Sequence, residues 1–440
     1  MAARFQVPDS ARWALTHGLI RLVLRSEARK GNENTRFLTD PEVRDNPYPH
    51  YESLRGSEPF ARGLAGKITV KHPVATEVLR CEHLGTASFG GAPKAIRRLL
   101  SVGATGRSVI EPPSMLAVDP PDHSRYRKLV TRAFTAKAVA ALRVRTEEVA
   151  GQLLDDLARE HAGRPVDLVR RYASQLPVIV ICEILGAPVE MRDQFLTWGD
   201  AAATSLDPGM PLKQFKHAQQ GIDALQDWMR GHFEALRRDP GDDVLSQLVT
   251  TADKDGEKLT ETELLATGLL VLAAGFETTV NLLGTGIALL QDHPEQRELL
   301  ERSPELWPNA VDEILRFDSP VQRTARRALR DTEIAGVPVR EEEIVVVLLA
   351  GANHDPDVFT DPGRFDVTRD NAGKHLSFSS GAHHCLGAQL ARMEGEVGLR
   401  TLTERFPALS LVGRPHRRPT SNLRGYDSLT AQLEARSPVS

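Results

Sequence analysis

A single cysteine near the end of the chain, Cys385, lies in the glycine-containing segment FSSGAHHCLG. Phe378 comes seven residues before it and His383 two residues before it. Gly381 and Gly387 allow the backbone to approach a flat surface closely, and their N–H groups can stabilise an anionic sulfur. A lone cysteine is more often a small buried apolar residue. The surrounding pattern instead predicts a thiolate ligand to the metal of a large planar cofactor.

The segment resembles the haem-binding loop of cytochrome P450 enzymes, usually written FGxGxHxCxG, with Ser379 where the first glycine is common. The resemblance implies haem b, with Cys385 as the ligand of its iron. A thiolate donates electron density that favours cleavage of an O–O bond. It also implies a mainly α fold with a smaller mixed β region, the triangular prism of this family. We expect one domain over residues 1–440, with residues 1–35 as an N-terminal extension.

The hydrophobic pattern agrees with a mainly helical chain that has no linker or internal repeat. The longest predicted helices are Ala136 to Ala158, Asp167 to Leu185, His217 to Arg238 and Glu261 to Leu290. Strand-like residues occur at Lys67 to Lys71 and again from Thr324 to Leu349, with a turn at Gly336. These distant strands predict one mixed sheet beside a large helical body.

The motif AGFETT interrupts the longest apolar helix with polar residues. Thr278 follows Ala274 by four residues, so its hydroxyl can bond to that carbonyl and open the helix locally. Small Ala274 and Gly275 leave room for a ligand against the backbone. The motif resembles the oxygen-activating AGxET stretch of P450 enzymes. The resemblance implies that Thr278 binds the activated oxygen by a hydrogen bond and that Glu277, with water, relays protons.

The segment EILR places Glu313 and Arg316 on one face of a helix. Such a pair is common on helix surfaces and means little alone. With the PVQ and DPGRF segments that follow, it resembles the ExxR pair of P450 enzymes. The resemblance implies a buried charge network that supports the cysteine loop, with Arg364 as its third member.

Four basic residues match the positions that hold the haem propionates in P450 enzymes. His123 and Arg127 are separated by four residues on one helical face, which suits two donors to one carboxylate. The resemblance assigns the same task to Arg326 and His383. It also implies a substrate cavity lined by Val271, Val321 and Gln322 and by the loop from about Cys81 to Val118.

These residues together predict a haem-thiolate monooxygenase that inserts one oxygen atom of O₂ into a small lipophilic substrate. Only 55 residues follow Cys385 (440 − 385), so we expect a separate ferredoxin and ferredoxin reductase to supply electrons. Two alternatives stay open: a haem-binding ligand sensor or carrier, and a peroxide-driven peroxygenase. Adjacent His383, His384 and Cys385 also allow a zinc cluster or a Cys–His pair, but no second ligand group appears.

Composition limits the setting of the protein. A net charge of −4 without a basic stripe argues against nucleic-acid binding. Three separated cysteines without a CxxC pair indicate a reducing cytoplasm, as in the soluble actinobacterial and mycobacterial P450 enzymes that the motifs resemble. The apolar segment Trp13 to Leu24 is too short to span a bilayer. Arg21, Arg25 and Arg29, which recur every four residues in and after this segment, allow a peripheral membrane contact, but we favour a surface helix packed on the fold.

Overall fold

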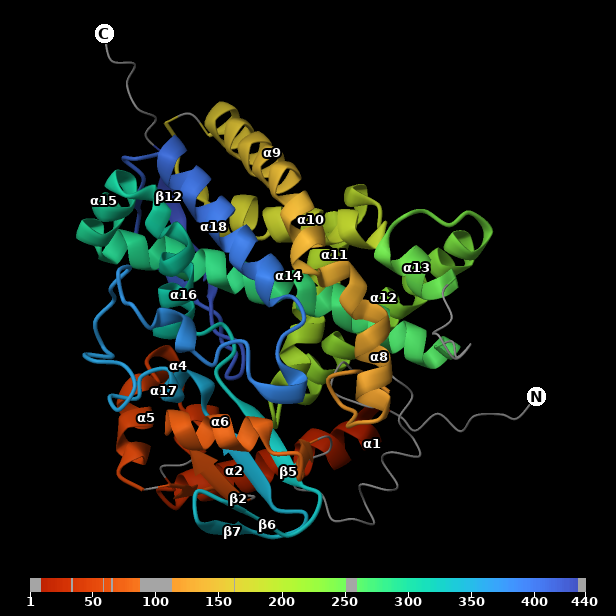
Figure 1. Cartoon of the computed structure of the whole chain (residues 1–440), viewed down its shortest axis with the longest axis vertical. Helices are drawn as coiled ribbons and strands as arrows, with labels where there is room; N and C mark the ends of the chain where they lie inside the picture. The colour runs from red at the N-terminus through yellow and green to blue at the C-terminus, as the bar shows by residue number, and fades with distance from the viewer. Residues whose placement is uncertain are drawn as a thin grey trace.

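In the computed structural model, the structure describes residues 9–32, 35–57, 59–64, 66–87, 113–161, 163–250 and 259–433. Figure 1 shows a large group of helices above a smaller part that contains the main sheet. The predicted fold class, mainly α with a smaller mixed β region, is confirmed.

The helical body is built on two long helices that pack against each other. They are α14 (Glu261–Asp292) and α18 (Ala388–Arg405), and α9 (Ala136–Glu160) packs against α18 in turn. Glycines allow the close approach: a Cβ at Gly395 would lie 2.9 Å from Leu282 Cδ2, and one at Gly398 2.8 Å from Leu283 Cδ2. This packing fixes the centre of α14 relative to the segment that leads into α18, which contains Cys385.

Three further helices cover α14: α10 (Gln175–Leu185), α11 (Arg192–Ala203) and α12 (Leu212–Arg238). The prediction of one helix from Asp167 to Leu185 is wrong at its beginning. Val166–Asp167 forms β4, paired with β12 (Thr430–Gln432), and a π-helical turn, Val169–Ala173, follows. Asp167 Oδ1 accepts hydrogen bonds from the amides of Val169 and Leu429. The carboxylate therefore stabilises the pairing of β4 with β12 and does not cap a helix that begins at Asp167.

The main sheet has the strand order β1-β2-β8-β5-β3 and brings distant segments together. Its strands are β1 (Ala61–Arg62), β2 (Gly66–Thr69), β3 (Leu84–Thr86), β5 (Thr324–Ala328) and β8 (Ile344–Val347). Strands β2 and β8 are parallel, whereas the other pairs are antiparallel. The predicted mixed sheet is therefore present.

The hairpin of β6 (Thr332–Ile334) and β7 (Val337–Val339) turns at Gly336, which has φ +74°. Such a left-handed conformation favours glycine. In the described part of the chain, two further small sheets pair β10 (His416–Arg417) with β11 (Tyr426–Ser428), and β9 (Ser410–Leu411) and β4 with β12. The prediction of a single sheet is therefore incomplete.

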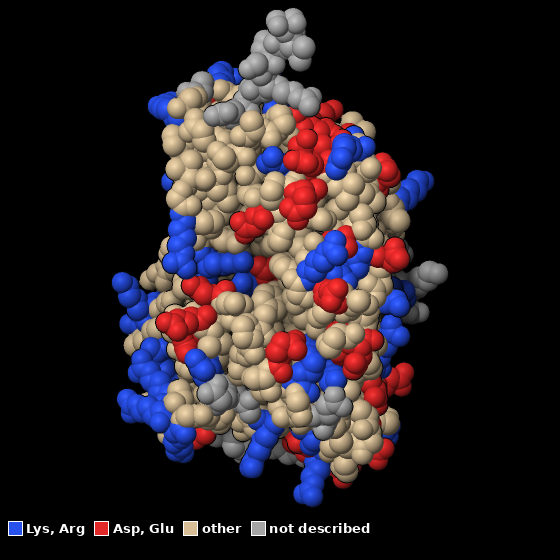
Figure 2. Space-filling model, turned by 90° about the vertical axis from the view of Figure 1, so that its left-hand side faces the viewer, with Lys and Arg blue, Asp and Glu red and all other residues tan. Residues whose placement is uncertain are grey.

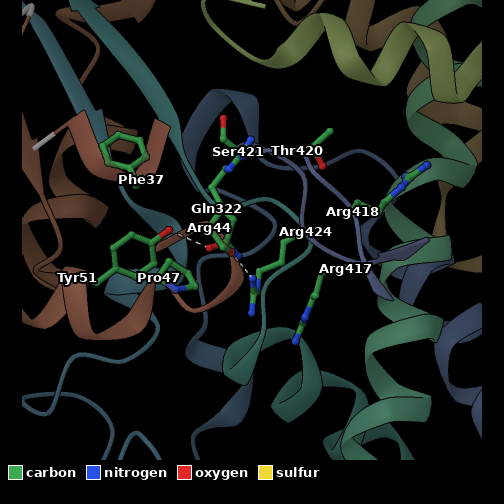
Figure 3. Close-up of a pocket in the computed structure, with 10 residues that line it drawn as sticks. All are labelled: Phe37, Arg44, Pro47, Tyr51, Gln322, Arg417, Arg418, Thr420, Ser421 and Arg424. Carbon is green, nitrogen blue, oxygen red and sulfur yellow. Dashed lines mark hydrogen bonds between the residues drawn. The ribbon is translucent and has the colours of Figure 1, made fainter. Parts of the chain in front are cut away.

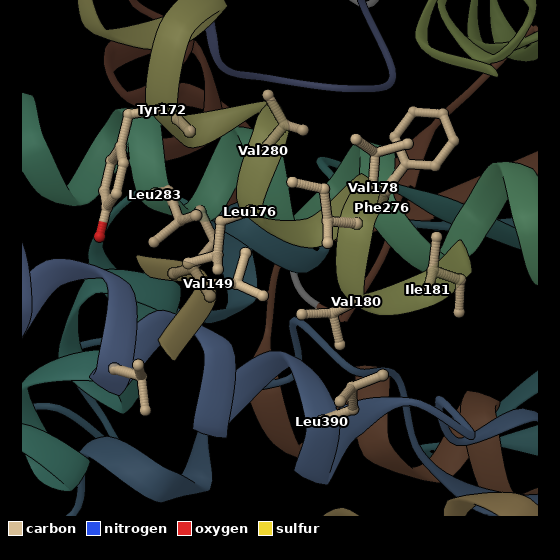
Figure 4. Packing of buried hydrophobic residues seen from close by; sticks show 14 of the residues in the cluster. Val149, Tyr172, Leu176, Val178, Val180, Ile181, Phe276, Val280, Leu283 and Leu390 are labelled. Carbon is tan, nitrogen blue, oxygen red and sulfur yellow. The ribbon is translucent and has the colours of Figure 1, made fainter. Parts of the chain in front are cut away.

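Apolar side chains from α10, α14 and α18 interlock beside the centre of α14 (Figure 4). Val178 and Ile181 of α10 lie near Phe276 of α14 in this cluster. The Tyr172 hydroxyl donates a 2.7 Å hydrogen bond to Gly398 O, which ties the turn before α10 to α18. Close packing of this kind holds the helix that carries the AGFETT motif rigidly.

The N-terminal helices α1 (Asp9–Trp13) and α2 (Leu19–Arg29) contact the connection between α11 and α12. Trp13 Nε1 donates to Met210 O at 2.9 Å and Arg21 Nη1 donates to Gly209 O at 2.9 Å. Among the described residues, one helix, α14, has the length and apolar composition of a membrane span, and 78% of its most apolar window is buried inside the protein. Its hydropathy is therefore that of a core helix.

Candidate active site

The cysteine loop is shaped by hydrogen bonds within its own backbone. Cys385 N donates to Phe378 O at 2.9 Å, and Ser379 N donates to Leu376 O at 2.8 Å. Gly381 has φ +71°, and a Cβ there would lie 2.4 Å from Leu79 O. Packing of the loop against α6 (His72–Arg80) therefore requires this glycine. A Cβ at Gly387 would meet nothing within 4 Å. Gly387 therefore leaves open space beside the cysteine.

Cys385 has open surface, yet protein surrounds it closely enough that burial raises the pKa of its thiol. The Gly387 amide and the charges of Arg127 and Arg392 act in the opposite direction, since each favours a thiolate. We conclude that the open surface of Cys385 faces a space enclosed by the fold.

The centre of α14 carries a similar opening. Ala274 is exposed and Gly275 and Thr278 are partly exposed, although the residues on either side of this stretch are buried. Thr278 Oγ1 donates to Ala274 O at 3.3 Å, which is the local contact that the sequence predicts. A Cβ at Gly275 would lie 2.8 Å from Ile181 Cδ1, so this glycine is also needed for packing against α10. The AGFETT stretch thus exposes a small polar surface within the core.

Glu277 has a partner that the sequence does not predict. Its buried carboxylate forms an ion pair with Arg418, which follows β10 near the end of the chain. Arg418 also forms ion pairs with Asp200 of α11 and, at 3.4 Å, with Asp427 of β11. Glu277 is thereby connected through Arg418 to two more exposed acids.

Glu313 and Arg316 lie together in α16 (Trp307–Phe317) and are both 0% exposed. Arg316 Nε donates to Glu313 Oε2 at 2.6 Å and Nη2 donates to Oε1 at 2.8 Å. Arg316 also donates to the carbonyls of Asn353, Pro362 and Arg364. This pair joins α16 to the irregular segment that precedes the cysteine loop.

The third side chain of this network is Arg369, and the prediction of Arg364 is wrong. Arg369 Nε lies 3.2 Å from Glu313 Oε1, whereas the Arg364 side chain is 67% exposed. Arg364 contributes its backbone carbonyl, which accepts from both Arg316 and Arg369. The irregular chain turns between these residues, so helical spacing gives no guide to which arginine points inward.

Three basic side chains lie together near the loop: buried His123 and Arg326, and partly buried His383. His123 of α8 (Asp122–Val130) lies against His383, with ring centroids 4.1 Å apart. Burial, with Arg326, His123 and Arg127 nearby, lowers the pKa of His383 to about 3. Burial also lowers the pKa of Arg326 to about 10. Within the described residues, Arg326 bonds to Thr324 Oγ1 and Ala325 O and forms no ion pair with an acid.

The cavity residues expected from the sequence are only partly brought together. Val271 is a buried residue of α14, and Val321 forms a β-bridge with Leu423. Gln322 accepts from the Tyr51 hydroxyl and donates to Ser319 O, so its amide is already used within the protein. Gln322 also lines the pocket shown in Figure 3, and its place in the substrate cavity stays a prediction. Residues 88–112 of the predicted cavity loop lie outside the described residues.

The family model that matches this chain is that of cytochrome P450, over residues 111–302 and 305–424. The chain belongs to the cytochrome P450 family.

Among its relatives is the putative cytochrome P450 140 of Mycobacterium bovis, 49% identical over 98% of this chain and 99% of the relative. The vitamin D(3) 25-hydroxylase of Pseudonocardia autotrophica is 43% identical over 83% of this chain and 88% of its own. Among solved structures, P450BioI bound to an acylated acyl carrier protein has a TM-score of 0.82, with 32% identity over 90% of this chain and 99% of that chain. The chain therefore has the P450 fold and is a P450 monooxygenase, a family whose cofactor is haem held by a thiolate.

The side chains of this P450 fit such a cofactor. Arg326 is a buried guanidinium that feels the charge of Asp119 but has no ion pair among the described residues. Such a group is costly unless an anion pairs with it, and haem carries two carboxylates. The open surface of Cys385 and the space beside Gly387 suit a flat ligand held by sulfur. These are the features that a haem would complete.

Sequence reasoning missed three charged residues of this P450: partly buried Arg369 and Arg418, and fully buried Glu394. Glu394 of α18 is 1% exposed, and neither carboxylate oxygen has a hydrogen-bond partner among the described residues. Burial raises its pKa well above the ordinary value, and the hydroxyl of Thr279 opposes this shift. A glutamate within an otherwise apolar face of α18 was the available signal.

Proposed function

We propose that haem b binds between the Cys385 loop and the centre of α14, with Cys385 as the iron ligand. The observation that carries this proposal is the pair of openings inside the fold, at Cys385 and at Ala274 with Thr278. Phe378, Gly381 and Gly387 shape the cysteine side, whereas Ala274 and Gly275 leave room on the other side. His123, Arg127, Arg326 and His383 hold the two propionates.

When bound, the haem supplies the redox chemistry in which a C–H bond, O₂, two electrons and two protons give a hydroxyl group and water. The chain's residues manage the protons. The Thr278 hydroxyl, held at 3.3 Å from Ala274 O, can turn to donate into the opening. Glu277, with water, relays protons to the Thr278 hydroxyl. The ion pair with Arg418 keeps the Glu277 carboxylate oriented and links it to Asp200 and Asp427.

The substrate that we propose is a small lipophilic molecule, and the electron donor a ferredoxin with its reductase. Two relatives are named as hydroxylases, of 6-deoxyerythronolide B in Saccharopolyspora erythraea and of vitamin D(3) in Pseudonocardia autotrophica. Near the cysteine loop, Arg125 is paired with Glu263 and Arg392 with Asp312, whereas Lys128 is exposed and suits an acidic partner.

The first test compares two cysteine variants. Purified wild type should show the reduced, carbon monoxide-bound band that is typical of haem-thiolate proteins. Cys385→Ala should lose this band, whereas Cys81→Ala, at a partly buried cysteine in another element, should retain it. Retention of the band by Cys385→Ala, or a purified protein without haem, would show that the proposal is wrong.

The second test addresses the proton path. Thr278→Ala should reduce product formed per NADPH consumed by about 10- to 100-fold and release hydrogen peroxide instead, and Thr278→Ser should restore coupling. Turnover driven by hydrogen peroxide alone and unaffected by Thr278→Ala would favour a peroxygenase. Absence of NADPH-linked O₂ consumption with diverse ligands would favour a sensor or carrier.

A further inference from the structure

An open pocket lies between α4 (Pro41–Asp45) and the chain after β10, and we call it the arginine pocket (Figure 3). Its empty volume, including the mouth, is about 340 Å³. Four of its ten lining residues are Arg44, Arg417, Arg418 and Arg424, and none is Asp or Glu. Such a concentration of guanidinium groups is unusual for a space that protein atoms alone surround.

The arginines have too few carboxylates near them. Arg418 points away from the other three in Figure 3 and is paired with Glu277, Asp200 and Asp427. Arg417 and Arg424 share one carboxylate, that of buried Asp318, at 2.9 Å and 2.6 Å.

The pKa of Asp318 is held far below its usual range: burial opposes this shift, but the charges of Arg424 and Arg417 outweigh it. With Arg44, three cations therefore face one anion, an excess of +2 (3 − 1).

Two donor atoms in this group lack a properly aligned acceptor. Arg44 Nη1 donates to Pro419 O at 2.9 Å, but Arg44 Nε is buried without a hydrogen-bond partner among the described residues. Arg417 Nη1 is near Asp318 Oδ2, yet the alignment of a hydrogen bond is missing. Buried donors of this kind cost free energy unless a ligand or water accepts from them.

We propose that the arginine pocket binds one oxyanion group, a carboxylate or a phosphate, through Arg44 and Arg417. Guanidinium groups recognise both anions through paired N–H donors. The anion would neutralise part of the excess charge around Asp318 and accept from the donors that lack partners. Its source is either a free small anion or the head group of an amphipathic molecule.

If the anion is the head group of an amphipathic molecule, the rest of that molecule would enter the proposed substrate cavity, so this inference rests in part on the proposed function. Gln322 lines the arginine pocket, and adjacent Val321 bridges to Leu423. Successive side chains of an extended segment point in opposite directions. The side chains of Gln322 and Val321 therefore point to opposite sides of the chain. An anion bound beside Gln322 would contact the segment that also positions Val321.

The test uses the haem-loaded full chain and its thermal unfolding. Phosphate should raise the melting temperature above that in chloride at equal ionic strength. Arg44→Gln should weaken phosphate affinity at least tenfold, because it removes the guanidinium whose Nε lacks a partner but keeps the Arg44 carbonyl that Arg424 uses. Arg238→Gln, an exposed position in α12 outside the pocket, is the matched control and should bind as wild type does.

A second arm separates the two sources of the anion. If the source is an amphipathic molecule, decanoate should shift the haem Soret band, phosphate should compete with it, and Arg44→Gln should weaken both. If the source is a free anion, phosphate should stabilise the protein while decanoate leaves the Soret band unchanged.

Equal melting temperatures in phosphate and chloride, without a decanoate effect, would overturn the inference, as would unchanged binding by Arg44→Gln. If Arg44→Gln fails to fold, diffraction from crystals soaked in selenate should show the anion at Arg44 and Arg417, and a signal elsewhere would overturn the proposal. A stabilising phosphate effect in protein that lacks the carbon monoxide-bound band would contradict only the proposed function.

Discussion

Two regions of the molecule bury polar side chains equally deeply but pair them differently. In the brace formed by Glu313, Arg316 and Arg369, the ionic groups bond to one another and to backbone carbonyls. Beside the centre of α14, Asn281 and both oxygens of Glu394 have no hydrogen-bond partner among the described residues.

The difference distinguishes side chains that support the fold from side chains that are available to a ligand. The brace is completed by the protein itself, so it can hold the Cys385 loop in shape before any ligand arrives. The polar groups around α14 need water or ligand to complete their hydrogen bonds, and proteins retain such groups mainly where they serve function. Four predictions test this contrast, from the largest expected effect to the smallest.

Glu313→Gln should have the largest effect on stability. It leaves the Arg316 guanidinium buried without its counter-charge, which costs about 3–5 kcal/mol in comparable pairs. Urea unfolding monitored by circular dichroism measures this loss, and haem content should fall with it. The matched control is Glu404→Gln in α18, which breaks an exposed pair with Arg400 and should cost less than about 0.5 kcal/mol. Equal losses would mean that the brace is not a structural unit.

Arg369→Ala and Arg364→Ala distinguish the observed brace from the one expected from the sequence. Arg369 bonds to Glu313 and to three backbone carbonyls, so its loss should cost about 1–3 kcal/mol. Arg364 keeps its carbonyl in the alanine variant, and its exposed side chain should contribute less than about 0.5 kcal/mol. A larger loss in Arg364→Ala, by the same urea titration, would restore the original assignment.

The part of the site that could be predicted from the sequence is the part with fixed local spacing. The bond from Thr278 to Ala274 and the pair of Glu313 and Arg316 follow from helical periodicity. The partners Arg369 and Arg418 could not be predicted, because irregular chain brings them to Glu313 and Glu277 from 56 and 141 residues away in sequence (369 − 313; 418 − 277). The long helices and paired strands were predictable for the same reason, whereas the beginning of α10 depends on pairing with β12.

Glu394→Gln tests the unpartnered side of the comparison and should stabilise the protein at neutral pH. Because burial raises the pKa of Glu394, the native state keeps a proton that the unfolded chain releases above about pH 4.5. Wild-type stability therefore falls as pH rises from that value toward the raised pKa. The gain from glutamine should be on the order of 1 kcal/mol at pH 8 and should shrink toward pH 4.5. Unfolding curves across this range measure it, and a gain that grows on acidification would contradict the account.

The smallest effect should come from Ser379, where the cysteine loop departs from the usual glycine. Ser379 has φ +60°, a conformation that favours glycine, and its buried Oγ has no hydrogen-bond partner among the described residues. Ser379→Gly should therefore stabilise the protein by about 0.5–1 kcal/mol. The neighbouring Ser380 is the control, because its backbone is extended at φ −151° and its Oγ accepts from Arg80 Nε at 2.8 Å. Ser380→Gly should destabilise by a similar amount, and urea midpoints that move in the same direction for both variants would show that local strain at Ser379 is not the cause.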